Sequence, residues 1–432
     1  KEGYQEVEGK VIGSNVIEGP NGKISCFKHG VVDAWYMPLN LLEYMRKTIT
    51  VAGELHENIL YHAQIIKVPD KKIDRDPEKE AKSLNDLLKI RAANREKIEK
   101  VNGNLGTALG FKWINNQKTE HPCVIVFVPQ KAASWLVPKE ERVPGFLETD
   151  DGLWCWTDVI TGGKTPSLEE ISPLPELSED NKRIVKELQS GRVGLIGGIQ
   201  IAFFSDGIED SQHAFVGTAG IAVKHKQTKK VGFLTNQHVA EVRGRKIYHP
   251  IHKYYRIGQT EETREVVADE NWYKEVVDET YSYVRCDCGF VEVDDHLRKH
   301  VNAGLHVIGK TGPLLDIDPK TMGIIGQKVI SIGRTRGVQR GTIVAYAYEF
   351  YDEFLSVYTD LLILGEDGQA FSWKGDSGKI IVTDDDEGEH RPVALLWGGW
   401  QERLRQGQEQ EIWSYAIDLG KVLDQLNLEL FK

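Results

Sequence analysis

The sequence predicts a mainly β protein with an α/β N-terminal region and a C-terminal helix. Short runs of β-branched and aromatic residues, separated by glycine-rich turns, dominate from about residue 190 to residue 415. Helical periodicity is confined to a few short segments. A histidine that ends one apolar run, His238, is followed far downstream by a serine between glycines, Ser377. The order and spacing of these two residues link the predicted fold to a predicted chemical function.

The region before the β-rich part is expected to regulate it or to join copies into a homo-oligomer, and we assign it residues 1–161. Within it, residues 83–101 carry one apolar stripe at helical spacing, and Ser83 with Asp86 three positions later is typical of a helix start. Residues 162–189 predict a proline-rich linker that ends in a short helix.

Composition restricts the possible partners. The 432 residues carry a formal charge of −11, which argues against partners such as nucleic acid or an anionic membrane surface. No apolar stretch approaches the length that spans a bilayer. A hydrophobic content of 40% is sufficient for a sizeable core, so the sequence predicts a globular protein with neither nucleic-acid nor membrane partners.

The cysteines indicate a reducing compartment. There are five, an odd and scattered set without the paired spacing of a zinc site. Reduced structural thiols are therefore expected, and with them an intracellular, cytoplasmic location. The five are Cys26, Cys123, Cys155, Cys286 and Cys288.

His238 is the first candidate catalytic residue. Residues 231–235 (VGFLT) predict a strand that runs into residues 236–240 (NQHVA). A strand end projects the imidazole from a rigid edge, which suits a general base. A core histidine at a strand–helix junction is the alternative for such a residue taken alone.

Ser377 lies in the turn Gly375-Asp376-Ser377-Gly378. The two glycines allow a backbone twist that turns successive amides inward. The N–H groups of Gly375 and Ser377 are then candidates for an oxyanion hole, beside a serine nucleophile. A plain surface turn is the alternative when the motif is considered alone.

The acid that orients the histidine is predicted to be Asp287. It interrupts an apolar β run at residues 284–293, where a carboxylate is costly to bury unless a donor such as a histidine N–H binds it. Asp294 and Asp295 follow the strand and fit a solvated turn, whereas Asp278 has no strand context. A purely structural carboxylate at 287 stays the alternative.

These motifs resemble those of the trypsin-like serine peptidases, and more narrowly those of the plant Narrow Leaf proteases and their microbial relatives. The resemblance runs from about residue 104 to the C-terminus and implies a trypsin-like double β-barrel in which His238, Asp287 and Ser377 take the triad positions. It rests on residues 106–111 (GTALGF), 152–156 (GLWCW), 231–240 (VGFLTNQHVA), 341–347 (GTIVAYA), 375–378 (GDSG) and 395–399 (LLWGG).

The resemblance also implies a domain layout. Residues 190–432 would form the protease domain, with a first barrel at about 190–305, a second at about 320–418 and a final helix at 419–426. The sequence departs from the family pattern where cysteines flank Asp287, where Lys379 follows Gly378, and where Trp373 precedes the nucleophile.

Substrate-binding residues follow from the same resemblance. A strand after the nucleophile pairs with the substrate backbone in this fold, and Leu396, Trp397, Gly398 and Gly399 resemble it. The floor of the specificity pocket would be Phe371, whose apolar side chain predicts cleavage after uncharged residues rather than after Lys or Arg.

Several other patterns suggest sites that we do not adopt. Gly163-Lys164-Thr165 imitates the end of a phosphate-binding loop but lacks its earlier glycine and its strand–helix context. His249 and His252 have no companion ligands, and the acidic run at 384–387 predicts a solvated turn, so neither metal nor cofactor is expected. A zymogen-like cleavage after Arg192, whose new amino terminus would pair with Asp376, is disfavoured against an uncleaved strand.

The leading hypothesis is a serine endopeptidase acting on protein or peptide substrates, without cofactor, through His238, Asp287 and Ser377. A catalytically silent binding module on the same barrels is the alternative, because a fold does not guarantee an activity.

Overall fold

The structure is a computed structural model that divides into two compact units. One comprises residues 1–79 with 113–119 and 131–142; the other comprises residues 80–112, 120–130 and 143–432. It describes residues 4–29, 36–39, 41, 48–57, 59–67, 75–101, 103–114, 117–132, 136–162, 176–205, 214–268, 272–273, 282–352, 355–366, 370–385, 388–404 and 411–432.

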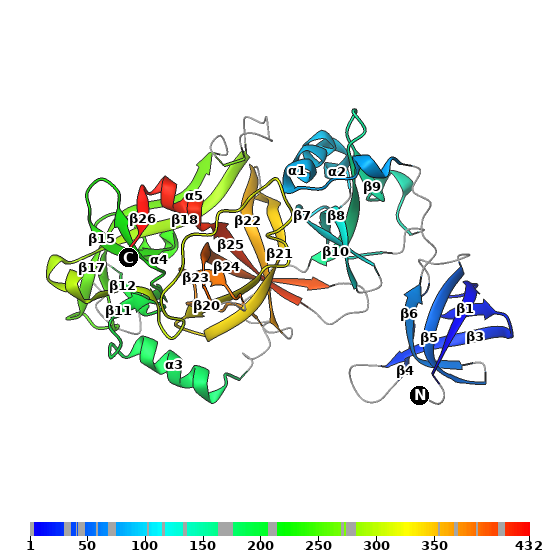
Figure 1. Cartoon of the computed structure of the whole chain (residues 1–432), viewed down its shortest axis with the longest axis horizontal. Helices are drawn as coiled ribbons and strands as arrows, with labels where there is room; N and C mark the ends of the chain where they lie inside the picture. The colour runs from blue at the N-terminus through cyan, green and yellow to red at the C-terminus, as the bar shows by residue number, and fades with distance from the viewer. Residues whose placement is uncertain are drawn as a thin grey trace. The chain divides into compact units, whose positions relative to one another are not determined.

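The first unit is built on a small ring of strands, drawn in blue in Figure 1. Its strands are β1 (Tyr4–Val11), β2 (Val16–Gly19), β3 (Gly22–His29), β4 (Tyr36–Pro38), β5 (Thr48–His56) and β6 (Ile59–Lys67). Antiparallel pairs β1–β2, β2–β3, β1–β5 and β5–β6 and a parallel pair β3–β6 close the ring. This strand order is that of a five-stranded Greek-key barrel of the OB type. Its core is apolar and includes Val11, Ile17 and Val51, each essentially inaccessible to solvent.

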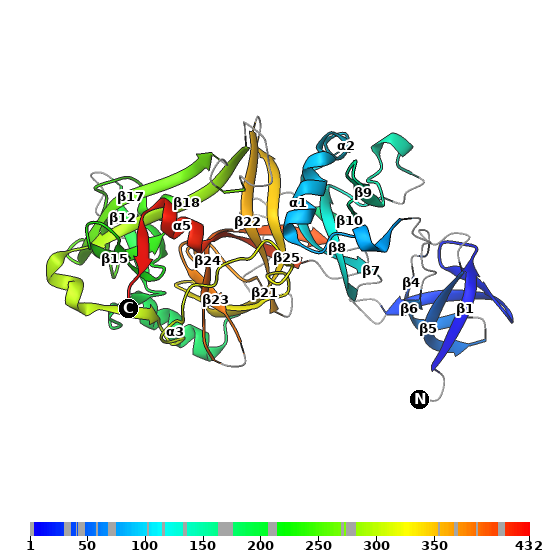
Figure 2. The same ribbon diagram turned by 45° about the horizontal axis from the view of Figure 1, so that its top comes forward.

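The second unit contains two β-barrels, which lie beside each other in both views (Figures 1 and 2). The first barrel pairs β15 and β17 with β18, β17 with β16, β16 with β12, β12 with β13, and β14 with β15. Its strands are β12 (Gln200–Phe204), β13 (Ala214–Thr218), β14 (Ala222–His225), β15 (Val231–Thr235), β16 (Lys246–Tyr248), β17 (Arg256–Ala268) and β18 (Ser282–Val293). The short strands β11 (Leu195–Gly197) and β19 (Val301–Leu305) pair with each other.

The second barrel is a ring of six antiparallel strands in the order β20-β21-β22-β25-β24-β23, closed by the pair β23–β20. The strands are β20 (Lys328–Gly333), β21 (Gly337–Asp352), β22 (Leu355–Gly365), β23 (Ile380–Thr383), β24 (Pro392–Leu404) and β25 (Glu411–Asp418). Helix α5 (Leu419–Gln425) follows, and β26 (Leu428–Leu430) returns the chain to β14 of the first barrel.

Most of the segment from residue 80 to residue 162 belongs to the same unit as the barrels, whereas its residues 113–119 and 131–142 belong to the other unit. Its β7 pairs with β21 and its β10 with β24, and the buried ring of Phe127 packs edge-on against Tyr348 and Trp413 of the second barrel. Its elements are α1 (Leu84–Ala93), α2 (Arg95–Glu99), β7 (Gly106–Ile114), β8 (Gln117–Val128), β9 (Phe146–Glu148) and β10 (Trp154–Gly162). The segment that the sequence analysis grouped with residues 1–79 is thus hydrogen-bonded to the barrels.

The mainly β, double-barrel fold is confirmed. Helix α1 begins at the predicted cap, where Ser83 Oγ accepts a hydrogen bond from Asp86 N at 3.1 Å. Helix α3 (Glu179–Gln189) lies at the end of the predicted linker, whose residues 163–175 are outside the described part of the chain. Among the described residues, no helix is long and apolar enough to cross a membrane.

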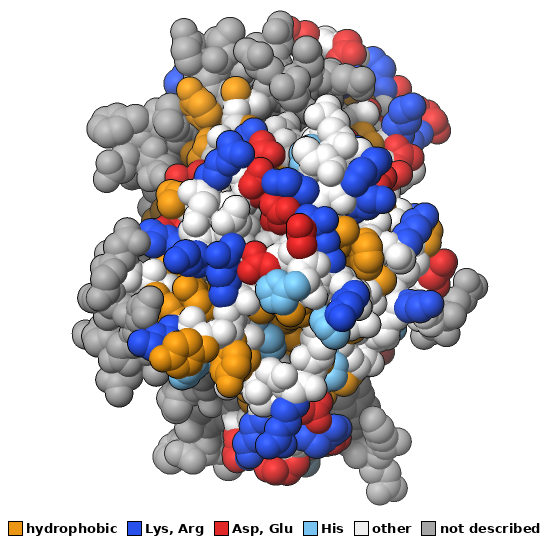
Figure 3. All heavy atoms as spheres, turned by 90° about the vertical axis from the view of Figure 1, so that its left-hand side faces the viewer, with side chains coloured by type: hydrophobic (Ala, Val, Ile, Leu, Met, Phe, Trp, Pro, Cys, Tyr) orange, Lys and Arg blue, Asp and Glu red, His pale blue; other side chains and the backbone are white. Residues whose placement is uncertain are grey.

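Acidic and basic side chains are interspersed on the face that Figure 3 shows, which is the face on the side of the first barrel. This mixture forms no broad patch of one sign in that view. The expectation that nucleic acid is not a partner stays a prediction.

Candidate active site

His238 is held at a junction between a strand and a single helical turn. β15 ends at Thr235, and helix α4 (Gln237–Ala240) follows at once, so the histidine lies in the turn rather than on the strand end itself. Asn236 O accepts the N–H of Ala240 at 2.9 Å, and Thr260 Oγ1 donates to Ala240 O at 2.6 Å. These bonds fix the turn to the barrel and thereby orient the imidazole.

The structure brings His238 and Asp287 together. His238 Nδ1 lies 2.8 Å from Asp287 Oδ2, and the backbone N–H of His238 donates to Asp287 Oδ1 at 3.2 Å. A carboxylate can only accept, so Nδ1 carries the proton and Nε2 keeps its lone pair. The imidazole is 44% exposed whereas the carboxylate is 1% exposed. The predicted base therefore reaches solvent while its orienting acid is buried.

Asp287 is built into β18 in an unusual way. Its φ is +26°, a region that non-glycine residues rarely adopt. Asn236 Nδ2 donates to Asp287 O at 2.7 Å, and the thiols of Cys286 and Cys288 approach each other to 3.3 Å behind it. Burial raises the pKa of Cys288, which keeps that thiol protonated. Strained backbone that its surroundings maintain is a feature of functional sites.

Ser377 lies against the same end of the first barrel. Its carbonyl accepts the N–H of Thr218 at 2.9 Å, and Thr235 Oγ1 donates to the carbonyl of Thr218 at 2.9 Å. A side chain on Gly378 would come within 2.3 Å of Thr235 Oγ1, so the serine turn packs closely on the strand that leads to His238. Within the described residues, Ser377 Oγ itself makes no hydrogen bond.

The two predicted oxyanion donors are the amides of Gly375 and Ser377. Gly375 has a φ of +96° and Gly378 a φ of +93°, as the glycine-framed turn requires. In the part of the chain that the structure describes, neither N–H donates a hydrogen bond. Two neighbouring amides without acceptors are the arrangement that a developing oxyanion needs.

The predicted substrate strand lies in β24. Leu396 is buried, and its main chain bonds with Gly378 N and Lys379 O, which ties this strand to the serine turn. Gly398 and Gly399 pair with β25, whereas β23 pairs with β24 no further than Leu395. Among the described residues, the other edge of this segment is therefore open to an added strand, which is a common mode of peptide binding.

The Trp397 side chain is fixed between two neighbours. Its ring stacks on Tyr415 with centroids 5.2 Å apart, and its Nε1 donates to Thr359 Oγ1 at 2.9 Å. The guanidinium carbon of Arg285 lies 5.2 Å from the centroid of the Trp397 ring. Trp397 is half-buried and thus retains a surface that substrate could contact.

Phe371, the predicted pocket floor, has no solvent-accessible surface. The ring lies inside the second barrel, where a side chain on Gly341 would come within 2.9 Å of it. Lys379 Nζ is 4.4 Å from the ring centroid and donates to Phe371 O at 2.7 Å. The ring therefore faces a buried ammonium, and in this conformation it does not line an accessible surface.

The patterns set aside in the sequence have ordinary structural explanations where they are described. His249 is buried, its pKa is lowered by burial, and Nδ1 bonds to Gln200 O at 2.6 Å. The described residues contain no cluster of three or more metal-ligating side chains, and all five cysteines are free. The loop-like motif at 163–165 lies outside the described residues.

Two models of known protein families match this chain. A family model described as the Nal1 C-terminal domain matches residues 185–432, and one described as the NARROW LEAF 1 N-terminal domain matches residues 79–160. The chain belongs to the Nal1 family. The matched ranges begin near residue 80 and end at residue 432, and residues 1–78 lie outside both of them.

Individual relatives agree with this assignment. The Nal1-family chain is 31% identical over 376 residues to Protein NARROW LEAF 1 of Oryza sativa subsp. japonica, covering 81% of this chain and 61% of the rice protein. It is 31% identical over 167 residues to a probable serine protease of Bradyrhizobium tropiciagri, covering 34% of this chain and 20% of that one. This Nal1 chain thus spans less than two thirds of the length of either relative.

Solved protease structures match part of this Nal1 chain. Nocardiopsis protease (NAPase) and Thermobifida fusca protease A each match 55% of the chain with a TM-score of 0.35, at 17% and 16% identity. These matches cover 99% and 98% of the two proteases.

Sequence reasoning missed residues that hold this Nal1 site in place. Asn236, Thr218 and Thr335 act through bonds to main-chain atoms, and ordinary polar residues of this kind carry no motif. Lys379 did leave a signal, because a charged residue stands between the glycine-framed serine turn and the apolar run at residues 380–382. What Lys379 contacts is known only from the folded structure, in which its side chain is buried.

Proposed function

We propose that this Nal1-family chain is a serine endopeptidase that cleaves peptide bonds through an acyl-enzyme intermediate. The observation that carries the proposal is the 2.8 Å contact between His238 Nδ1 and the buried carboxylate of Asp287. It leaves the lone pair of Nε2 available to accept a proton. The Ser377 turn packs against β15, the strand that leads to His238, which supports Ser377 as the proton donor.

In the first half of the reaction, Ser377 Oγ attacks the substrate carbonyl carbon while His238 Nε2 takes the hydroxyl proton. The carbonyl oxygen becomes negative and is held by the N–H groups of Gly375 and Ser377, which have no acceptor among the described residues. Asp287 stabilises the imidazolium that forms. The imidazolium then gives its proton to the leaving amine, and the C–N bond breaks.

In the second half, water attacks the acyl group on Ser377. His238 again takes the proton, and returns it to Ser377 Oγ as the acid product leaves. The open edge of β24 at residues 397–399 supports an extended peptide as the substrate, with its backbone pairing to this segment.

Covalent labelling tests the proposal directly. A fluorophosphonate probe should label the wild-type chain and should fail to label Ser377→Ala or His238→Ala. Ser190→Ala and His300→Ala, which alter exposed residues of the same types, should label like wild type. Labelling of Ser377→Ala at the wild-type rate would show that the probe reacts elsewhere and would remove the support for this site.

One observation favours a second candidate, a binding module that does not cleave. Ser377 Oγ makes no hydrogen bond within the described residues, so the serine is not linked to its base in this state. Hydrogen bonds of this kind often tighten only when substrate is bound. A peptide library incubated with the wild-type chain distinguishes the two: cleaved products that Ser377→Ala does not give support the protease, and capture of intact peptides by both supports the binder.

A further inference from the structure

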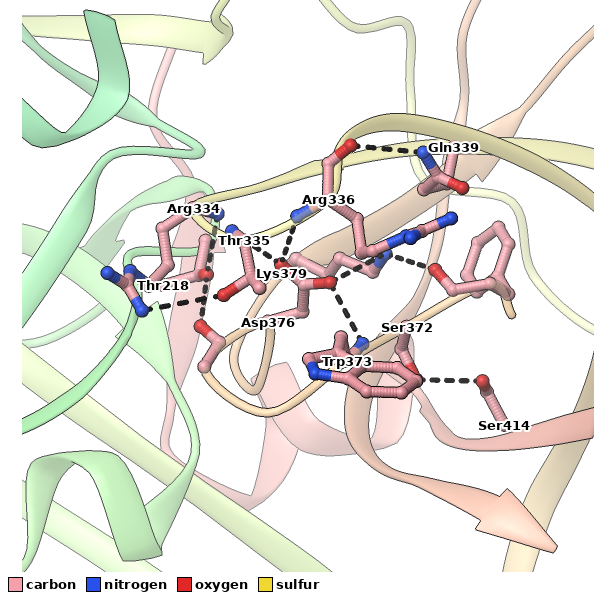
Figure 4. A network of polar contacts seen from close by, with 12 residues as sticks. Thr218, Arg334, Thr335, Arg336, Gln339, Ser372, Trp373, Asp376, Lys379 and Ser414 are labelled. Atoms are coloured by element: carbon pink, nitrogen blue, oxygen red, sulfur yellow. Dashed lines mark hydrogen bonds and ion pairs between the residues drawn. The ribbon is translucent and has the colours of Figure 1, made fainter. Parts of the chain in front are cut away.

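Lys379 is a buried cation next to the proposed nucleophile that the mechanism above does not use. Its side chain has no solvent exposure. Nζ donates to Phe371 O at 2.7 Å, lies over the Phe371 ring and is 4.0 Å from Asp376 Oδ2 (Figure 4). One ammonium thus links the beginning of the segment 371–379 to its middle.

The Asp376 carboxylate, which faces Lys379, also binds main-chain N–H groups. Its Oδ1 accepts the backbone N–H groups of Thr335 at 2.9 Å and Arg336 at 3.2 Å, and its Oδ2 accepts the N–H of Trp373 at 3.0 Å. Figure 4 shows the carboxylate enclosed by these groups, with Lys379 on one side. A carboxylate with no solvent exposure needs such donors, because burying an isolated charge is very costly.

The same network sets the direction of the two oxyanion amides. Lys374 O accepts the hydroxyl of Thr335 at 2.9 Å, and Asp376 O accepts the N–H of Lys379 at 3.1 Å. A trans peptide places its N–H opposite its carbonyl. The N–H groups of Gly375 and Ser377 therefore point away from these anchors and stay without an acceptor among the described residues.

We propose that the protonated side chain of Lys379 is a positioning residue, which holds segment 371–379 in the form that presents the Gly375 and Ser377 amides to an oxyanion. This inference rests on the proposed protease function for its effect on activity, but not for its effect on the order of the segment. It also removes the need for a new amino terminus after Arg192, because the Asp376 carboxylate already faces an internal cation.

The charge on Lys379 can change within an accessible pH range. Burial lowers the pKa of Lys379 to about 8, partly offset by Asp376 and reinforced by Arg336. Arg334, whose pKa is also lowered by burial, is the other charged group near Asp376. Lys379 is therefore charged below about pH 8 and becomes neutral as the pH rises through that value. The segment loses its internal cation in the same interval.

A matched control exists elsewhere in the same unit. Lys421 Nζ donates to Trp272 O at 3.0 Å, lies 4.5 Å from the Tyr273 ring centroid and is 3.9 Å from the buried Asp360 Oδ1. This cluster repeats the carbonyl, ring and carboxylate that surround Lys379, but none of its members belongs to segment 371–379. Lys421→Met should thus remove a half-buried ammonium from a buried carboxylate without moving the oxyanion amides.

The first experiment measures hydrogen exchange of peptides covering residues 371–380 at pH 7 in wild type, Lys379→Met and Lys421→Met. Loss of the internal cation should lower protection of this segment about tenfold in Lys379→Met and leave it unchanged in Lys421→Met. Unchanged protection in a folded Lys379→Met chain would overturn the inference. The measurement needs no catalysis, so it stands apart from the proposed function.

The second experiment follows fluorophosphonate labelling from pH 6.5 to pH 9.5. The wild-type labelling rate should fall as the pH passes about 8, while Lys379→Met should be slow, by about 100-fold, and flat across that interval. Wild type that labels with no alkaline fall would overturn the inference and leave the protease intact. Wild type that never labels, but whose segment loosens in Lys379→Met, would support the positioning role and contradict the protease.

Measurements on the wild-type chain alone still test the inference if the substitution at Lys379 prevents folding. If Lys379→Met does not fold, exchange of peptides 371–380 in the unmodified chain at pH 7 and pH 9, corrected for intrinsic exchange, decides the question. Protection that is lost at pH 9 in this segment, and kept around Lys421, supports the inference. Equal protection at both pH values overturns it.

Discussion

The two barrels of the second unit hold their parts of the site by different means. The first barrel fixes His238 and Asp287 on a helical turn and a strand that the β ladder already positions, and it adds one hydrogen bond from Asn236. The second barrel presents Ser377 on an irregular segment, 371–379, whose shape depends on a buried carboxylate and a buried ammonium.

The positions of His238 and Asp287 are thus maintained by hydrogen bonds between strands, whereas the position of Ser377 is maintained by buried charges. Hydrogen bonds between strands are spread over many residues, so the loss of one shifts the base and acid little. The serine segment has few such bonds, and a single side chain there links distant main-chain atoms. The His238–Asp287 pair should therefore keep its geometry over a wider range of pH, and after more single substitutions, than segment 371–379.

The largest effect on activity is expected when Asp287 loses its charge while the first barrel keeps its shape. Asp287→Asn should lower kcat/KM on the order of 10⁴-fold, because the amide favours the wrong histidine tautomer. The assay is peptide hydrolysis or fluorophosphonate labelling. Asp295→Asn, at an exposed carboxylate that pairs with Arg298, is the control and should leave the rate unchanged. Equal rates for Asp287→Asn and wild type would contradict the orienting role.

A smaller but still large effect is expected from crowding the second barrel's segment. Gly375→Ala would place a Cβ 2.7 Å from Thr335 Oγ1, at a φ of +96°, and should reduce the rate about 100-fold by displacing an oxyanion donor. Gly244→Ala has a similar φ of +84° with nothing within 4 Å of the new Cβ, so it separates backbone strain from crowding. If both variants lose the same activity, crowding of the segment is not the cause.

A smaller effect on rate is expected from Asn236→Ala, which tests how firmly the β ladder holds Asp287. Asn236→Ala removes the donor to Asp287 O and leaves that buried carbonyl unpaired, which should cost about 1–3 kcal/mol of unfolding free energy. We expect a lower Tm but only a modest loss of rate at temperatures where the chain is folded. Asn302→Ala, which removes a comparable bond to His300 O at an exposed site, should change neither. A loss of rate as large as that of Asp287→Asn would show that the ladder does not hold the acid.

The smallest effect is expected at Arg192. Arg192→Gln should leave labelling and cleavage unchanged, because the Asp376 carboxylate already has backbone donors and an internal cation. Mass spectrometry of the active protein should show an intact bond after residue 192. Activity that appears only after cleavage there, and not in Arg192→Gln, would restore the zymogen alternative.

Much of the fold could be predicted from local pattern. Strand β15, helix α1 with its Ser83 cap and helix α5 all follow from periodicity and capping residues that act over a few positions. The strand order of residues 4–67 could not be predicted, because pairing of β3 with β6 joins segments that share no local signal. Sequence pattern identifies strands and rarely their partners.

The site was predictable to a similar extent. His238, Asp287 and the Gly375–Gly378 turn stand out because their residue types conflict with their surroundings: a histidine after an apolar strand, a charge within one, and glycines around a serine. Phe371, the predicted floor of the specificity pocket, is fully buried in this conformation, with Lys379 Nζ 4.4 Å from its ring centroid. Its apolar character indicated burial equally well, and only the barrel around it decides which applies.

By itself, the sequence determined the strand-rich character of the chain, its family and the residues with chemical capacity, since these depend on residue type and short-range spacing. Tertiary structure alone decided that His238 meets Asp287, that two amides of the serine segment are left without acceptors in the described chain, and that Lys379 becomes an internal cation. Burial changes what a charge does, and burial is a property of the packed chain rather than of any short stretch of it.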